Sequence, residues 1–131
     1  MADRAAFADE VEADLFISLH MNSATATAKG TEVFYSSSNN KTLSNGLNSK
    51  KVATYFEKNI SSSLGMNSRG VKAANFVVIY KNTVPAVLVE LGFISNSSDR
   101  EKLINKTFQK KSAKKMYELT EDIFRDYPTG R

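Results

Sequence analysis

Apolar and polar positions follow one another along the chain in short blocks that predict alternating strands and helices. Apolar runs rich in β-branched and aromatic residues occupy residues 14–20, 30–35 and 86–91, and the last of these directly follows a proline. Runs of this length are typical of strands buried in a sheet, and an X-Pro pair favours an extended entry. A further short strand is predicted over residues 76–80, after a loop over residues 66–74.

Longer blocks with apolar residues at helical spacing predict two long helices. Residues 41–64 carry an apolar position every fourth residue in their second half, and Gly65 stands where a left-handed residue commonly ends a helix. The second helix is predicted from about Thr107 until Pro128, which cannot continue a helix. The apolar positions of these two helices are Val52, Phe56, Ile60 and Leu64, and then Phe108, Met116, Leu119, Ile123 and Phe124.

Two shorter helices are predicted from their capping residues. Asp3 is a suitable cap for a helix near the N-terminus, in which Phe7 and Val11 share one apolar face at a spacing of four. Ser98 and Glu101 have the spacing of a capping box, which predicts a short helix after the strand at residues 86–91.

The order of these elements predicts the fold class. Alternating strands and helices indicate an α/β fold in three layers, with a mostly parallel central sheet flanked by helices. No repeat or linker divides the chain, so residues 1–131 are predicted to belong to a single domain. A chain of this length buries roughly two thirds of the surface that its unfolded form exposes, which is enough for one core.

Two polar residues stand where catalytic groups are expected in such a fold. Glu90 interrupts the apolar run at residues 86–91, and His20, the single histidine of the chain, ends the run at residues 14–20. Burying a carboxylate is costly unless it is paired, protonated or turned toward a ligand. If the two strands lie parallel in one sheet, His20 and Glu90 emerge at the same edge, where α/β proteins bind ligands. A structural carboxylate and a satisfied histidine are the alternative reading.

Composition excludes several kinds of site. The chain has no cysteine, so disulfides and a cysteine nucleophile are excluded, and no G-x-S-x-G motif accompanies its single histidine. The net charge is +4, but the sequence has no basic motif interleaved with aromatic residues, so nucleic-acid binding is not predicted. No apolar run reaches the length of a membrane span, and no signal-peptide pattern is present. Five lysines predict one solvated helix face: Lys106, Lys110, Lys111, Lys114 and Lys115.

Several separated motifs occur in the order found in one enzyme family. They read EADLFISLHMNS, KGTEVFY, SRGVKAANFVVIYKNTVPAVLVELGFISN and SSDREKL. Through them the chain resembles the zinc-dependent N-acetylmuramoyl-L-alanine amidases of bacterial cell walls. The resemblance implies that His20 is a zinc ligand and Glu90 the catalytic carboxylate. It also implies a peptidoglycan substrate, cut between N-acetylmuramic acid and the L-alanine of the stem peptide, and an extracellular or cell-wall location.

The chain departs from that family at its N-terminus. A complete domain of the family opens with a Gly-His-Gly segment and a helical glutamate, which supply two further zinc ligands; neither precedes residues 14–20 here. We therefore expect an N-terminally truncated domain in which His20 is one of three expected protein ligands. The alternative is a catalytically inactive, amidase-like module that keeps a peptidoglycan groove, or an inactive fragment. A sheet that lacks strands exposes an edge, which predicts self-association.

Overall fold

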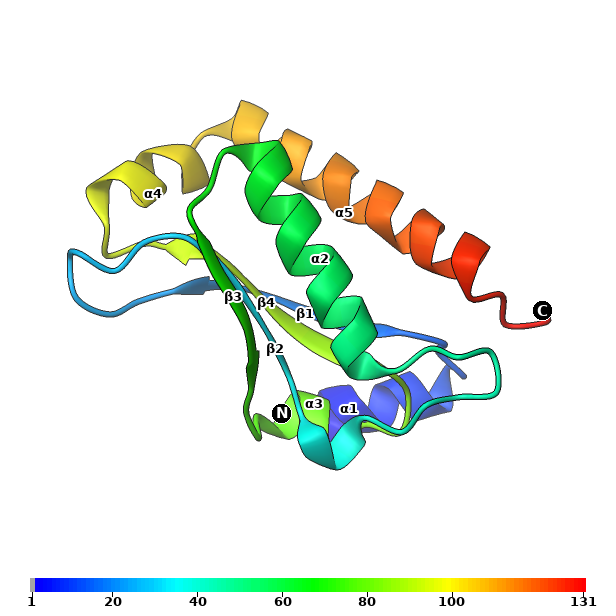
Figure 1. Cartoon of the computed structure of the whole chain (residues 1–131). Coiled ribbons are helices and arrows are strands. Elements are labelled where there is room, and N and C mark those ends of the chain that lie inside the picture. Colours follow the sequence, from blue (N-terminus) through cyan, green and yellow to red (C-terminus); the bar gives the residue numbers. More distant parts are fainter. Residues whose placement is uncertain (1) are drawn as a thin grey trace.

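The computed structural model describes residues 2–131 and contains one four-stranded sheet between two layers of helices (Figure 1). The spatial order of the strands is β1-β4-β2-β3. Strands β1 and β4 are parallel, as are β2 and β3, whereas β2 and β4 are antiparallel, so two of the three pairings are parallel. The strands are β1 (Phe16–Asn22), β2 (Thr31–Tyr35), β3 (Ser68–Ala73) and β4 (Ala86–Phe93).

Helices cover both faces of this sheet. In Figure 1, α2 and α5 lie over one face, and α1 and α3 lie together on the opposite side. The helices are α1 (Ala2–Glu10), α2 (Ser49–Leu64), α3 (Val77–Tyr80), α4 (Ser97–Leu103) and α5 (Lys106–Asp126), with a 3-10 turn at Ser37–Asn39. The predicted three-layer α/β fold with a mostly parallel sheet is therefore confirmed. In the part of the chain that the structure describes, none of the helices is long and apolar enough to cross a membrane.

Each face of the sheet has its own apolar core. The larger core joins the sheet to α2 and α5 and includes Val33, Val89, Phe56 and Leu119. The smaller core joins the sheet to α3 and contains Val78, Ile79, Ala86 and Leu88. Successive side chains of a strand point to opposite faces. Leu88 and Glu90 therefore lie on the same face of β4, with Leu88 in the smaller core and Glu90 beyond it.

The predicted helix at residues 41–64 is shorter in the structure. Helix α2 begins at Ser49, where the Asn48 side chain accepts a hydrogen bond from the backbone N–H of Lys51 at 2.9 Å. The preceding segment is a loop, and Gly46 within it has a positive φ of 91°. The predicted end at Gly65 is confirmed, because this residue has the left-handed conformation of a helix cap.

Two predictions around residues 66–80 are wrong. The predicted loop contains strand β3, whose side chains are largely polar or small and partly exposed, as is typical of the outer strand of a sheet. The predicted strand at residues 76–80 is instead the short helix α3, which buries Val78 and Ile79 against the sheet. A short apolar run fits a strand and a buried helical turn equally well, so its packing partner decides the outcome.

Both short-helix predictions need correction in detail. Helix α1 forms, but it buries Ala5 and Ala8, whereas Phe7 and Val11 are 59% and 54% exposed. Asp3 lies within the first turn of α1, so it is not the cap residue. Helix α4 also forms, but its cap is Asn96, two residues before Ser98. The Asn96 side chain accepts a hydrogen bond from the backbone N–H of Asp99. Terminal turns are decided by local hydrogen bonds that sequence spacing describes loosely.

Candidate active site

His20 and Glu90 are direct neighbours across two parallel strands. Strand β1 pairs with β4 in a register that sets His20 opposite Glu90. Both residues lie toward the carboxyl ends of their strands, where the sheet edge of an α/β protein usually forms its binding crevice. The predicted meeting of these two residues at one edge is therefore confirmed. The Nε2 atom of His20 is 2.9 Å from the Ser18 hydroxyl oxygen, within hydrogen-bond distance.

The Glu90 carboxyl group is partly buried and incompletely satisfied. Its Oε2 atom is buried and has no hydrogen-bond partner among residues 2–131. Burial raises the pKa of Glu90 from its usual 4.5 to about 7, and the nearby carboxylate of Glu32 contributes in the same direction. A carboxyl with a pKa near neutrality is able both to take up and to release a proton at physiological pH. This property suits a general acid–base group.

Glu32 adds a second carboxylate to the same row. Strand β2 sets Glu32 opposite Glu90 on the other side of β4 from His20, so the three residues cross the sheet in line. Glu32 is only 4% exposed, and protein donors replace the water that its buried carboxylate has lost. It accepts hydrogen bonds from Asn22 Nδ2 at 2.8 Å and from Arg69 Nε at 3.2 Å, and it also pairs with the Lys72 ammonium group.

A bulge in β3 brings both cations to Glu32. The β2–β3 register steps from Thr31 opposite Ser68 to Val33 opposite Val71, so β3 contains one extra residue. Within this step Gly70 has a φ of 83°, which L side chains rarely adopt. Without the extra residue, strand alternation turns Arg69 and Lys72 to opposite faces. The bulge places both on the face of Glu32, and bulges commonly re-aim side chains beside active sites.

The described residues do not by themselves complete a zinc site. Catalytic zinc normally takes three protein ligands, and a fourth position is open to water. Residues 2–131 contain no group of three histidine, cysteine, aspartate or glutamate side chains arranged to hold a metal ion. His20 places one imidazole at this edge, so a zinc ion bound here would need further donors.

Three of the residues at this edge were given no role in the sequence analysis. Glu32 is part of the KGTEVFY motif and, like Glu90, is a glutamate within an otherwise apolar strand. That shared pattern was sufficient to single it out. Arg69 and Lys72 lie in the segment that was predicted to be a loop, and only the pairing of β3 with β2 brings them to Glu32.

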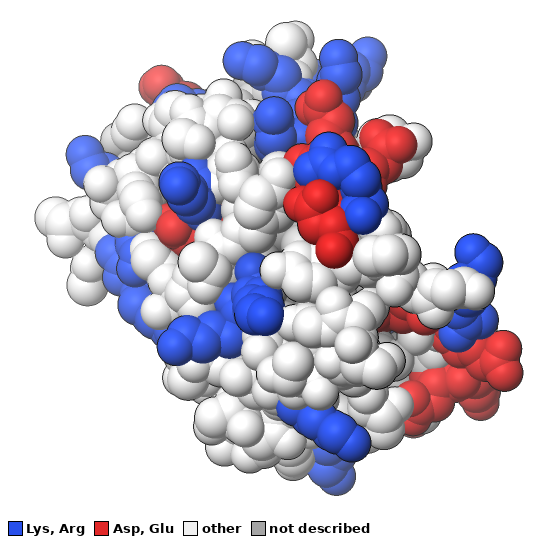
Figure 2. Space-filling view, turned by 45° about the vertical axis from the view of Figure 1, so that its right-hand side comes forward, with Lys and Arg blue, Asp and Glu red and all other residues white. Residues whose placement is uncertain are grey.

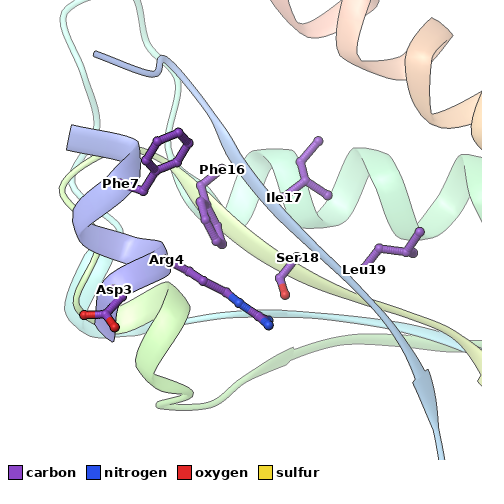
Figure 3. A pocket seen from close by; sticks show the side chains of 7 residues that line it. All are labelled: Asp3, Arg4, Phe7, Phe16, Ile17, Ser18 and Leu19. Atoms are coloured by element: carbon purple, nitrogen blue, oxygen red, sulfur yellow. The ribbon is translucent and has the colours of Figure 1, made fainter. Parts of the chain in front are cut away.

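A hollow of about 470 Å³ lies beside the outer edge of β1, separate from the Glu90–Glu32 pair. Figure 3 shows Phe7 from α1 beside Phe16 from β1, with the Arg4 side chain extending toward Ser18. Leu19, which also lines this hollow, is 55% exposed. The hollow is mainly apolar and follows the unpaired outer edge of β1, and neither His20 nor Glu90 lines it.

Positive charge is dispersed elsewhere on the surface. Figure 2 shows lysine and arginine side chains scattered among uncharged residues on the face in view, with acidic side chains in the upper part of the view and at its right-hand edge. The five lysines of α5 include exposed side chains such as Lys110 and Lys111, as the predicted solvated helix face requires.

Sequence comparison identifies related proteins. The profile of the N-acetylmuramoyl-L-alanine amidase family matches residues 1–121. YqiI of Bacillus subtilis (strain 168) is 42% identical over 113 residues, which cover 86% of this chain and 52% of YqiI. N-acetylmuramoyl-L-alanine amidase LytC of the same organism is 34% identical over 126 residues, covering 95% of this chain and 24% of LytC.

Solved structures give the same result. The catalytic domain of the amidase CwlV from Bacillus (Paenibacillus) polymyxa var. colistinus is 29% identical, with a TM-score of 0.83 over 95% of this chain and 66% of CwlV. An N-acetylmuramoyl-L-alanine amidase from Clostridium difficile 630 is also 29% identical, with a TM-score of 0.83 over 98% of this chain and 66% of its own. The chain spans about half or less of the two Bacillus relatives. On these matches, it belongs to the N-acetylmuramoyl-L-alanine amidase family.

Proposed function

We propose that the chain belongs to a catalytic domain that hydrolyses peptidoglycan. The bond cut is the amide between N-acetylmuramic acid and the L-alanine of the stem peptide. The observation that carries this proposal is the buried, unpartnered Oε2 atom of Glu90 opposite His20, at the edge where such sheets bind ligands. Membership of the amidase family supports the choice of substrate.

Glu90 has the properties needed to move the proton in this reaction. As its pKa is about 7, the carboxylate form takes a proton from the attacking water while the hydroxyl adds to the amide carbonyl carbon. The protonated form then donates to the amide nitrogen as the carbon–nitrogen bond breaks. The products are a lactyl carboxylate and the free amine of L-alanine, so one water is consumed and Glu90 is regenerated.

We propose His20 as a ligand of the zinc on which the resembled family depends. A zinc ion held there would lower the pKa of a bound water to about 7, and Glu90 would accept the proton of that water. Residues 2–131 provide no set of three ligands, so a zinc ion at His20 would need further donors, such as those of a second copy of the chain. The relatives include cell wall amidases, which supports an extracellular or cell-wall location for this chain.

The test is release of L-alanine amino termini from purified peptidoglycan, with zinc added and then removed by EDTA. We expect release by the unmodified chain to fall by a hundredfold or more in Glu90→Gln, the range for loss of a general acid–base group. Glu101→Gln removes an exposed carboxylate from α4 and is the matched control, with unchanged release expected. A zinc-loaded chain that binds peptidoglycan without releasing L-alanine termini contradicts the proposal and identifies a non-catalytic module.

We also propose that the outer edge of β1 pairs with β1 of a second copy. Strand β1 ends the sheet, so one row of its backbone groups faces away from β4, and Leu19 and Met21 are 55% and 50% exposed there. Light scattering is expected to give twice the 14.5 kDa chain mass at high concentration. Leu19→Lys is expected to restore the monomer. Ile104→Lys, at the exposed residue that follows α4, is the control and is expected to leave the dimer intact. A monomer at all concentrations contradicts the pairing.

A further inference from the structure

The Arg69 guanidinium group is held in place while two of its nitrogens stay unused. Its Nε donates to Glu32 Oε2 at 3.2 Å, and its central carbon lies 4.8 Å from the centre of the Phe93 ring. A carboxylate and an aromatic face together restrict how the planar group turns. Within residues 2–131, the two terminal nitrogens make no hydrogen bond, although the side chain is only 33% exposed. A fixed guanidinium with free terminal donors suits a carboxylate.

The charges around Arg69 do not balance. Glu32 contributes one negative charge, while Arg69 and Lys72 contribute two positive charges in contact with it. These three residues therefore have a net charge of +1, and Glu90, which lies opposite Glu32 on β4, adds a negative charge when it is ionised. The excess positive charge lies on the β3 side of Glu32, where it favours an anionic group. The Lys72 side chain is 42% exposed, so its ammonium group is also reachable from solvent. Were these residues purely structural, a single cation would be enough to neutralise Glu32.

The cluster lies at a defined distance from the reaction. In the sheet, β2 separates β4 from β3, and neighbouring strands are about 4.8 Å apart. The backbone of Arg69 is therefore about 10 Å from that of Glu90, and its side chain reaches back to Glu32, which lies opposite Glu90. An extended peptide advances about 3.5 Å per residue. A group one or two residues beyond the scissile amide thus falls near the Arg69 guanidinium.

We propose that Arg69, assisted by Lys72, binds a carboxylate on the stem peptide, carried by the residue that follows L-alanine. This inference rests on the proposed peptidoglycan substrate and adds a specificity determinant to it. The β3 bulge at Gly70 is the structural device that makes the subsite, because it turns both cations to the substrate side of the sheet. The subsite prefers an acidic stem peptide over one in which that carboxylate is an amide.

The test compares two probes that differ only at this group. The ¹⁵N-labelled 131-residue chain, kept in EDTA, is titrated by NMR with N-acetylmuramoyl-L-alanyl-D-isoglutamate and with the corresponding D-isoglutamine compound. We expect about fivefold tighter binding of the acid, the size of a charge-assisted contact at a partly exposed site. The largest shifts are expected at Arg69, Lys72 and Phe93.

Variants separate the subsite from general electrostatics. Arg69→Gln is expected to remove the preference for the acid, and Arg69→Lys to keep only part of it, because lysine lacks the planar fork. Lys110→Gln removes one positive charge from α5, in the layer on the other side of the sheet, and is expected to keep the full preference. A dispersed NMR spectrum of each variant verifies folding before the titration.

The possible outcomes are distinguishable. Equal affinities for the two probes, no binding of either, or an unchanged preference in Arg69→Gln overturns the carboxylate subsite. These results leave the proposed hydrolysis open to its own assay, since the titration needs neither metal nor turnover. Selective binding of the acid by a chain that releases no L-alanine termini supports the subsite and rejects the proposed hydrolysis.

Discussion

Replacing Glu90 by glutamine is expected to stabilise the fold, increasingly so as pH rises. The folded-state pKa of Glu90 is raised from 4.5 to about 7, so between these values the unfolded chain ionises while the folded chain keeps its proton. The folded state then binds more protons than the unfolded state, and linkage makes the free energy of unfolding fall with increasing pH. Above pH 7 the full penalty of the buried carboxylate is present. Glutamine, isosteric with the protonated acid, does not titrate and escapes this penalty.

The size of the effect follows from the pKa of Glu90. A rise from 4.5 to about 7 corresponds to about 3 kcal/mol, at about 1.4 kcal/mol for each tenfold change in proton affinity. Glu90 is only partly buried, and solvent screening reduces this to about 2 kcal/mol. The advantage of Glu90→Gln over the unmodified chain is therefore expected to be small at pH 5 and about 2 kcal/mol at pH 8.

Urea unfolding in EDTA, followed by circular dichroism at pH 5, 6, 7 and 8, measures this difference. The control is Glu101→Gln, which removes an exposed carboxylate from α4 and is expected to differ from the unmodified chain by a constant, small amount. A Glu90→Gln advantage that stays constant with pH, or that shrinks as pH rises, refutes the assignment of a destabilising carboxylate at this position. Similar slopes of the urea curves among variants confirm that the unfolded states are comparable.

Three further predictions concern Glu32, the turn before β2 and the bulge in β3. Glu32→Gln is expected to lower the pKa of Glu90 from about 7, because a repelling negative charge is removed; a ¹³C NMR titration of the Glu90 carboxyl measures this. Gly30→Ala is expected to destabilise the fold by about 3 kcal/mol or more, since a Cβ there lies 2.2 Å from the Asn67 carbonyl oxygen. Gly70→Ala, with positive φ but open space, is expected to cost about 1 kcal/mol in the same urea assay.

The sequence predicts best those elements whose apolar pattern along the chain matches the face that they bury in the core. The apolar run of β4 and the periodic face of α2 each meet a core, so local pattern and tertiary burial agree. Strand β3 was missed because it is an outer strand with half-exposed polar side chains, and its hydrogen bonds to β2 leave no trace in hydropathy. In α1 the larger residue Phe7 is exposed because the small Ala5 and Ala8 allow close packing, and Val11 is exposed beyond the end of the helix.

The residues of the active-site edge likewise fall into those that the sequence predicts and those that it does not. His20 and Glu90 were predicted because each is a polar residue within or at the end of an apolar run, and parallel strands bring their ends together. Strand β2 lies between β4 and β3, antiparallel to β4 and parallel to β3. This pairing of segments far apart in the sequence brings Glu32 and Arg69 toward Glu90. A single residue with positive φ, Gly70, then decides which face Arg69 occupies, and no periodicity reports that choice.

The arrangement of the two glutamates argues for function rather than stability. Glu32 is held by three donors, so its charge is well compensated, whereas the Oε2 atom of Glu90 has no partner within residues 2–131. An apolar residue at position 90 would continue the buried strand without the cost of ionisation. A destabilising group placed opposite the only histidine, with a compensated carboxylate beside it that raises its pKa, is the pattern of a residue kept for proton transfer.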